Sequence, residues 1–143
     1  MASGNKFNAL SATPWNGGLN LSSDSVKVLL TNTAPVATNS NYSDVSAGEL
    51  TGSNTGYTVG GAAVTLTSST QTGGLYKYIA SCGSPTWTAG STWATFRYVV
   101  MYDNTPAAKP LLGWWDYGGP VNMNSGDTFT VQLDPTNGVI QNS

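Results

Sequence analysis

Residues 91–134 read STWATFRYVVMYDNTPAAKPLLGWWDYGGPVNMNSGDTFTVQLD. We predict three β-strands in this stretch, at residues 91–102, 110–117 and 127–134. Most of the bulky apolar side chains of the protein lie on these adjacent segments. The three strands are therefore predicted to form the central sheet.

The last of these strands has the clearest pattern. Its apolar and polar side chains alternate, with Phe129, Val131 and Leu133 set against Thr128, Thr130 and Gln132. A period of two is required only of a pleated strand that has one face in a core and the other in water.

The first strand is predicted to be apolar on both faces at one end. One face carries Ala94, Phe96, Tyr98, Val100 and Tyr102. The other face begins polar and turns apolar at Val99 and Met101. We therefore expect this end of the strand to be covered on both sides.

The remaining strands are shorter and separated by polar or glycine-rich turns. They are predicted through Val26, Val28 and Leu30, around Val64 and Leu66, and at residues 75–80, with a polar turn at residues 68–74. Seven or eight short strands with almost no helix predict an all-β fold, an antiparallel β-sandwich of jelly-roll type.

The two least regular parts of the chain lie before and after the first of these strands. Residues 1–15 have weak helical spacing that Pro14 interrupts, so an N-terminal arm is predicted over residues 1–18 and one β-sandwich domain over residues 19–143. The excursion at residues 31–59 is predicted to be ordered, with one short helical turn capped by Ser43.

Charge is scarce, and this excludes one class of partner. Charged residues make up 8 % of the chain and its net charge is −2, against about a quarter charged residues in an average soluble domain. No basic stripe is available to follow a phosphate backbone, so we expect no nucleic-acid binding.

The chain shows no signal of secretion or membrane insertion. Its single cysteine, Cys82, cannot form an internal disulfide and is interpreted as a buried free thiol. Residues 1–10 do not resemble a signal peptide, and no apolar run is long enough to span a bilayer. We expect a protein made in a cytoplasm that does not bind membranes.

Catalysis has few candidate groups. The chain contains no histidine, which removes the commonest general base and the commonest metal ligand, and we predict no cofactor or metal site. A carboxylate pair of the glycosidase kind remains, with Asp116 and a partner among Asp103, Asp127 and Glu49. We expect the protein not to be an enzyme.

Aromatic residues offer a second possibility. Exposed aromatic faces bind sugar rings, and candidates for such a platform are Trp87, Trp93, Trp114, Trp115 and Tyr117. Aromatics on adjacent strands more often fill a core. The neighbours Trp114 and Trp115 should point to opposite faces of their strand, so one of them can serve an interaction surface.

The order of segments over most of residues 19–140 resembles a family of small virion proteins of tailed bacteriophages. The segments that carry the resemblance are Leu19–Leu30, Tyr42–Val45, Glu49–Gly52, Thr55–Val64, Arg97–Tyr102, Leu111–Gly118, Thr128–Val131 and Asn137–Gly138. The family pattern has no catalytic motif.

The resemblance implies a structural protein of the virion, on the capsid surface of a particle assembled in the host cytoplasm. For a chain of this size it implies a decoration (cement) protein, a homotrimer that bridges subunits of the major capsid protein. The interaction surface is predicted at the arm, the excursion and one tryptophan, with candidate residues Phe7, Trp15, Tyr42, Leu50, Trp114 and Trp115. A tail-associated adaptor and a carbohydrate-binding or receptor-binding module remain as alternatives.

Overall fold

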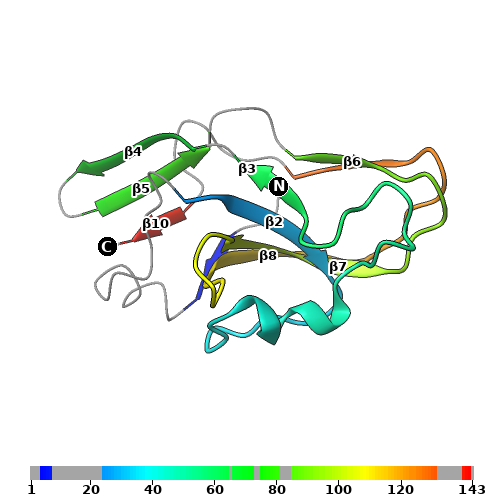
Figure 1. The fold of residues 1–143 in the computed structure, drawn as a ribbon, viewed down its shortest axis with the longest axis horizontal. Helices are drawn as coiled ribbons and strands as arrows, with labels where there is room; N and C mark the ends of the chain where they lie inside the picture. The colour runs from blue at the N-terminus through cyan, green and yellow to red at the C-terminus, as the bar shows by residue number, and fades with distance from the viewer. Residues whose placement is uncertain are drawn as a thin grey trace.

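A computed structural model describes residues 4–7, 24–64, 66–72, 75–80, 85–131 and 140–142. These residues form antiparallel strands and two short 3₁₀ turns (Figure 1). The strands are β1 (Gly4–Lys6), β2 (Val26–Thr31), β3 (Ala62–Val64), β4 (Leu66–Thr72), β5 (Leu75–Ala80), β6 (Thr86–Thr88), β7 (Phe96–Asp103), β8 (Leu111–Val121), β9 (Thr128–Thr130) and β10 (Ile140–Asn142). The predicted all-β class is confirmed, whereas the jelly-roll topology stays a prediction.

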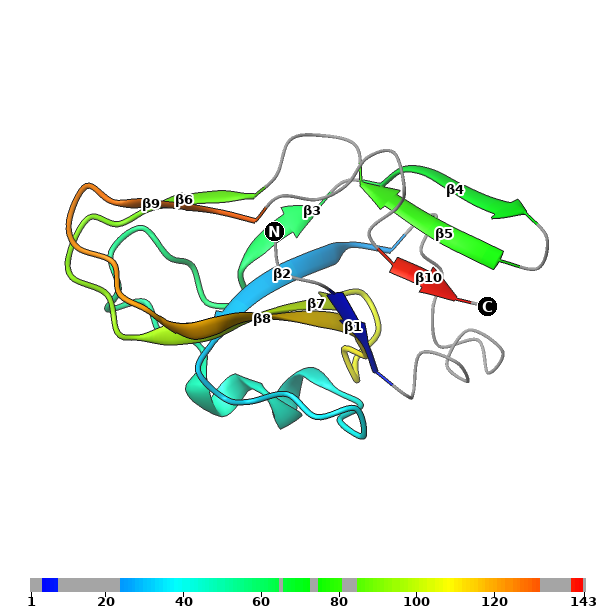
Figure 2. The ribbon, with the colours of Figure 1, turned by 180° about the vertical axis from the view of Figure 1, so that it is seen from behind.

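The main sheet has five strands in the order β1-β8-β7-β2-β3, and each neighbouring pair is antiparallel (Figure 2). Its centre is the β7–β8 pair, which corresponds to the first two strands predicted in the stretch at residues 91–134. The first of them begins at Phe96 instead of residue 91, because the preceding segment is held by loop contacts such as Trp93 N–H to Met123 O (2.9 Å).

The third predicted strand does not belong to the main sheet, which corrects the expected arrangement. β9 pairs with β6 in a separate two-stranded ribbon, with Trp87 opposite Phe129. The ring of Phe129 meets the ring of Phe96 edge-on at 4.9 Å. The ribbon therefore lies over the main sheet and packs on it face to face. A third sheet has the order β10-β5-β4.

A bulge changes which residues of β7 share a face. Phe96 pairs with Val121, and Tyr98 pairs with Asp116, so four residues of β8 lie opposite the single residue Arg97. Phe96 consequently joins the face of Val99 and not the predicted face of Val100. The bulge contains Gly118, whose φ of 82° lies in the left-handed region that glycine adopts without strain.

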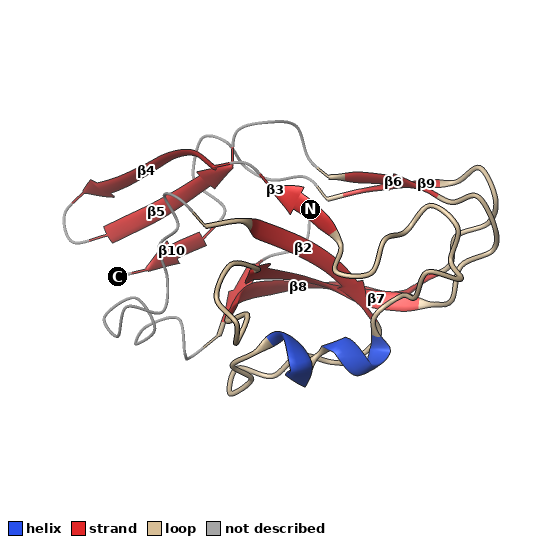
Figure 3. Ribbon diagram, in the orientation of Figure 1, coloured by secondary structure: helices blue, strands red, loops and turns tan. Residues whose placement is uncertain are grey.

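The main sheet is covered on both faces, as predicted for the apolar end of its central strand. One cluster contains Val99, Met101 and Trp115 and lies between the sheet and the β6–β9 ribbon. The other contains Val100 and Tyr102 and lies against the segment of 3₁₀ turns. Figure 3 shows these turns and the ribbon on opposite sides of the main sheet.

The excursion between β2 and β3 is ordered over its whole length, as predicted. It contains two 3₁₀ turns, η2 (Tyr42–Asp44) and η3 (Ser46–Gly48). The capping residue is Asn41 and not Ser43, because the Asp44 carboxylate accepts the backbone N–H groups of Ser40 and Asn41. Val45, between the two turns, is fully buried against the sheet.

Two further expectations need correction. Part of the predicted arm is a strand, because Gly4–Lys6 pairs with β8 and Phe7 is fully buried. β4 continues to Thr72 through the predicted polar turn, because its residues pair with β5 up to the contact of Thr72 with Leu75. The arm boundary after residue 18, Trp15 and Cys82 all lie outside the described residues.

Candidate functional site

The tryptophans proposed as a sugar platform are mainly core residues. Trp87, Trp93 and Trp115 have exposed fractions of 5 %, 4 % and 3 %. Trp87 packs near the rings of Tyr57 and Phe129, at centroid distances of 6.2 and 6.3 Å. These three indoles have no free face for a sugar ring.

Three of the six predicted interaction residues are also in the core, which corrects that prediction. Phe7, Leu50 and Trp115 are at most 3 % exposed, because each packs into one of the two clusters that cover the main sheet. Tyr42 and Trp114 are half-buried. As predicted, Trp114 and Trp115 point to opposite faces of β8.

Tyr42 and Trp114 both border the cluster beneath the 3₁₀ turns. The ring of Trp114 lies 4.5 Å from that of Phe7, and the ring of Tyr42 lies 5.1 Å from that of Tyr102. The ammonium group of Lys109 lies 5.2 Å from the centre of the Tyr42 ring. This side of the molecule therefore presents two partly exposed aromatic rings and one cation.

Glu49 is buried at the junction between the excursion and the main sheet. Its carboxylate accepts hydrogen bonds from the hydroxyls of Tyr42 and Tyr57 and from the backbone N–H of Gly60 (2.6 Å). Burial, together with the adjacent Glu49 carboxylate, raises the pKa of both tyrosine hydroxyls well above their ordinary value. They stay protonated and act as donors to the acid.

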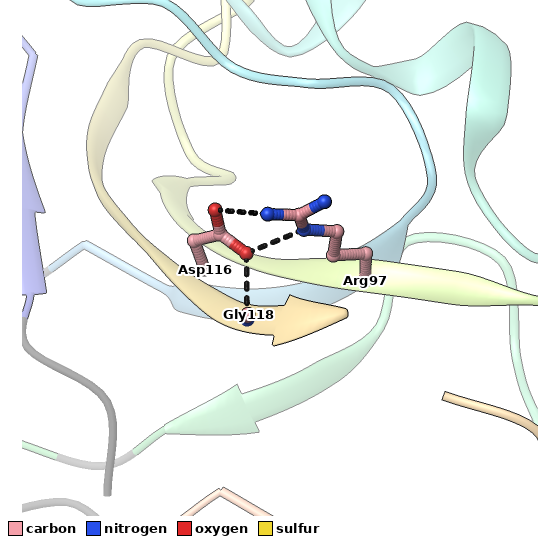
Figure 4. A network of polar contacts seen from close by, with 3 residues as sticks. All are labelled: Arg97, Asp116 and Gly118. Carbon is pink, nitrogen blue, oxygen red and sulfur yellow. Dashed lines mark hydrogen bonds and ion pairs between the residues drawn. The ribbon is translucent and has the colours of Figure 1, made fainter. Parts of the chain in front are cut away.

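A partly exposed ion pair lies at the bulge of β8 (Figure 4). Arg97 Nε and Nη2 donate to the two carboxylate oxygens of Asp116 at 2.7 and 3.0 Å, and the N–H of Gly118 donates to Asp116 Oδ1 at 2.8 Å. The hydrogen bonds from Arg97 and Gly118 lower the pKa of Asp116. Asp116 therefore stays ionised and is unsuited to the general-acid role in glycoside hydrolysis.

Asp103 is the most deeply buried of the described acids. It is fully buried at the end of β7, its Oδ1 accepts the N–H of Thr105 (3.0 Å), and the carboxyl group of Asp24 lies next to its own. Burial, followed by this contact with Asp24, raises the pKa of Asp103 to about 7. Burial and a neighbouring carboxyl group both disfavour the charged form of an acid, so Asp103 holds its proton to a higher pH than an exposed aspartate does.

The acids proposed as partners of Asp116 are bound elsewhere. Asp103 contacts Asp24, Glu49 contacts the tyrosines, and Asp127 accepts the N–H of Asn124 (2.9 Å). Among the residues that the structure describes, no three acidic or cysteine side chains are grouped in a way that could hold a metal ion.

Sequence reasoning missed the role of Glu49 and the contact between Asp24 and Asp103. Glu49 and Asp103 were considered as partners of Asp116 in catalysis, and Asp24 was not considered as a site residue. A signal for Glu49 was present, since it is the single glutamate of a chain with few charges and lies between Tyr42 and Tyr57. Nothing local to Asp24 or Asp103 in sequence indicates that they meet.

Comparison of the chain with protein-family models, with curated proteins and with solved structures finds no match. Within the described part of the chain, no helix is long and apolar enough to cross a membrane.

Proposed function

We propose that this protein is a structural component of a tailed-bacteriophage particle, a decoration protein that binds the outside of the assembled capsid. It stabilises the shell by bridging subunits of the major capsid protein. Its location is the virion surface, and its action is contact and not chemistry. The resemblance of its segment order to small virion proteins supports this assignment.

The observation that carries the proposal is the burial of the tryptophans. Trp87, Trp93 and Trp115 are core residues, which disfavours the sugar-binding alternative. The chain that remains outside the core is rich in serine, threonine, asparagine and glycine, with 8 % charged residues overall. A charge-poor surface suits a protein that works through contact area, because charged residues are depleted at the centre of protein interfaces.

The contact surface is best placed on the side of the 3₁₀ turns. We define the turn surface as Val36, Tyr42 and Trp114. Val36 is 52 % exposed in a tight turn closed by the hydrogen bond from Asn39 N–H to Val36 O (2.9 Å). Exposed apolar and half-buried aromatic side chains are the residue types that form the centre of protein interfaces.

A protein that binds the assembled shell but not its separate subunits stabilises the shell by mass action. The stabilisation grows with the logarithm of the decoration-protein concentration relative to its dissociation constant. Many copies on one shell add their contributions. A small gain for each contact can therefore raise the temperature at which the whole shell ruptures.

The test is co-sedimentation with expanded, empty shells of the phage that lack this protein, followed by heating. We expect saturation at a fixed ratio to the major capsid protein and a higher rupture temperature. Val36→Asp should weaken binding, whereas the control Val59→Asp should not, although Val59 is similarly exposed at 55 %. Protein that stays in the supernatant would contradict the proposal and favour the tail-adaptor alternative.

A further inference from the structure

The edge strands of this fold differ in how well they are protected from pairing with another chain. β1, β3 and β10, each at the edge of its sheet, contain three residues each. Very short edge strands are a common device against unwanted strand addition. β4, at the remaining edge of the β10-β5-β4 sheet, contains seven residues.

The sequence of β4 also lacks the usual protective residues. Leu66–Thr72 reads LTSSTQT, with no charged residue, no proline and no glycine. Its pairing with β5 has one irregularity between Leu66 and Ser68, and is regular from Ser68 to Thr72. The regular part has a row of backbone N–H and C=O groups on the side away from β5, to which no other described strand is paired.

Among the described strands, none lies beyond β4 in its sheet. In Figures 1 and 2 the β4–β5 hairpin extends from one end of the molecule, at the end opposite the β6–β9 ribbon, and β4 is its outer strand. A sheet of three strands, one of which is three residues long, is also small for independent stability.

We propose that the free edge of β4 pairs antiparallel with β4 of a second copy of this chain, across a two-fold axis near Ser69 and Thr70. A two-fold axis sets β4 of one copy antiparallel to β4 of the other. The N–H groups of each strand then face C=O groups of the other, as in any antiparallel pair. The uncharged sequence brings no like charges together. The two three-stranded sheets become one six-stranded sheet, in which the β4 edge of each copy is paired and β10 forms the two outer edges.

The inference does not rest on the proposed function. It predicts a dimer, whereas the resemblance to decoration proteins implies a trimer. The mass of the purified protein therefore tests it without any shell present.

The experiment measures mass by sedimentation velocity across a wide range of concentration for the wild type, Ser69→Lys and Ser69→Glu. We expect a wild-type dimer and, for each variant alone, a dimer dissociation constant raised by more than about tenfold by like charges at the axis. Mixing the two variants should restore the dimer, because opposite charges then meet. Restoration also shows that both variants are folded.

The matched control is Thr128→Lys, which adds the same charge at an exposed position of a three-residue strand. It should leave the dimer intact. A wild-type protein that is monomeric at every concentration would overturn the proposal. So would an oligomer, whether dimer or trimer, whose mass does not change in either Ser69 variant, and so would two weakened variants that fail to associate when mixed.

Discussion

The hydroxyl of Tyr57 donates a hydrogen bond to Oε1 of Glu49 at 2.7 Å, and the Tyr57 hydroxyl oxygen itself accepts the backbone N–H of Leu30 at 3.2 Å. Glu49 lies on the excursion and Leu30 lies on β2. One buried hydroxyl thus connects the excursion to the main sheet and satisfies groups on both. It acts together with the hydrogen bond from Leu50 N–H to Leu30 O (3.1 Å), which joins the same two segments.

We predict that Tyr57→Phe destabilises the protein by about 1–3 kcal/mol, the usual cost of leaving buried polar groups without a partner. The substitution keeps the ring but leaves Leu30 N–H without its acceptor and Glu49 without one of its donors. Urea unfolding measures the change in the free energy of unfolding. The control is Tyr98→Phe, at a half-buried ring beside Arg97, with an expected change within about 0.5 kcal/mol. Equal effects of the two substitutions would contradict the role given to Tyr57.

Gly61 and Gly118 allow backbone strain to be separated from steric overlap. Both have positive φ, 85° and 82°. A Cβ at Gly118 has no atom within 4 Å, whereas a Cβ at Gly61 falls 1.8 Å from the carbonyl oxygen of Val28. We expect Gly118→Ala to cost about 1–2 kcal/mol from strain alone, and Gly61→Ala to cost clearly more, because the junction of β2 and β3 must open. Thermal unfolding of both variants provides the comparison, and a similar cost at the two sites would show that Gly61 lies farther from β2.

Phe7 tests whether the beginning of the chain is part of the core. Its ring is fully buried and contacts Trp114 at 4.5 Å. Phe7→Ala should destabilise the protein by about 3–5 kcal/mol and change the fluorescence of Trp114, whereas Phe7→Leu should cost less because most of the volume remains. A loss of less than about 1 kcal/mol for Phe7→Ala would place the ring outside the core.

This contact also limits how truncations can be interpreted. Removal of residues 1–15 takes away β1 and the Phe7 side chain. Loss of shell binding by such a variant would reflect damage to the main sheet as well as loss of an arm. Substitution at the exposed Val36 avoids this ambiguity.

The sequence pattern predicted several strands closely but not which strands are neighbours. The alternation around Phe129 correctly indicated one buried face, and residues 75–80 form a strand with the predicted bounds. The partner of β9 is β6, however. A period of two shows which side chains of a strand face a core. It does not show whether another strand is a neighbour in the same sheet or a member of the opposing sheet.

The candidate sites were harder to predict because they depend on contacts between distant segments. The donors to Glu49 come from Tyr42, Tyr57 and Gly60, which the fold brings together. The bulge opposite Arg97 shifts the alternation by one residue, so a strict period assigned Phe96 to the wrong face. Such irregularities are set by the pairing of two strands and leave little signal in either strand alone.

The carboxyl pair of Asp24 and Asp103 predicts an unusual dependence of stability on pH. The pKa of Asp103 is raised from 3.8 to about 7 in the folded protein. Between these values the folded state holds a proton that the unfolded chain releases. The free energy of unfolding should therefore fall as the pH rises from about 4 to 7, by up to about 1.4 kcal/mol for each pH unit.

Other acids contribute with the opposite sign in a different range. The pKa values of Asp44 and Asp116 are lowered below 3.8, so their stabilising contributions are present above that value and are lost as the pH falls below it. The two effects are separated on the pH axis. A decline in stability between pH 4 and pH 7 is consequently assigned to the Asp24–Asp103 pair.

Asp103→Asn is the variant that tests this assignment. Its amide can donate to Asp24 in place of the protonated carboxyl group of Asp103, so the decline should disappear and the variant should be at least as stable as the wild type above pH 7. Asp127→Asn, at an exposed turn, should retain the wild-type decline. Urea unfolding at a series of pH values measures all three proteins. A wild-type profile that is flat between pH 4 and pH 7 would contradict the raised pKa of Asp103, because no proton would then be taken up on folding.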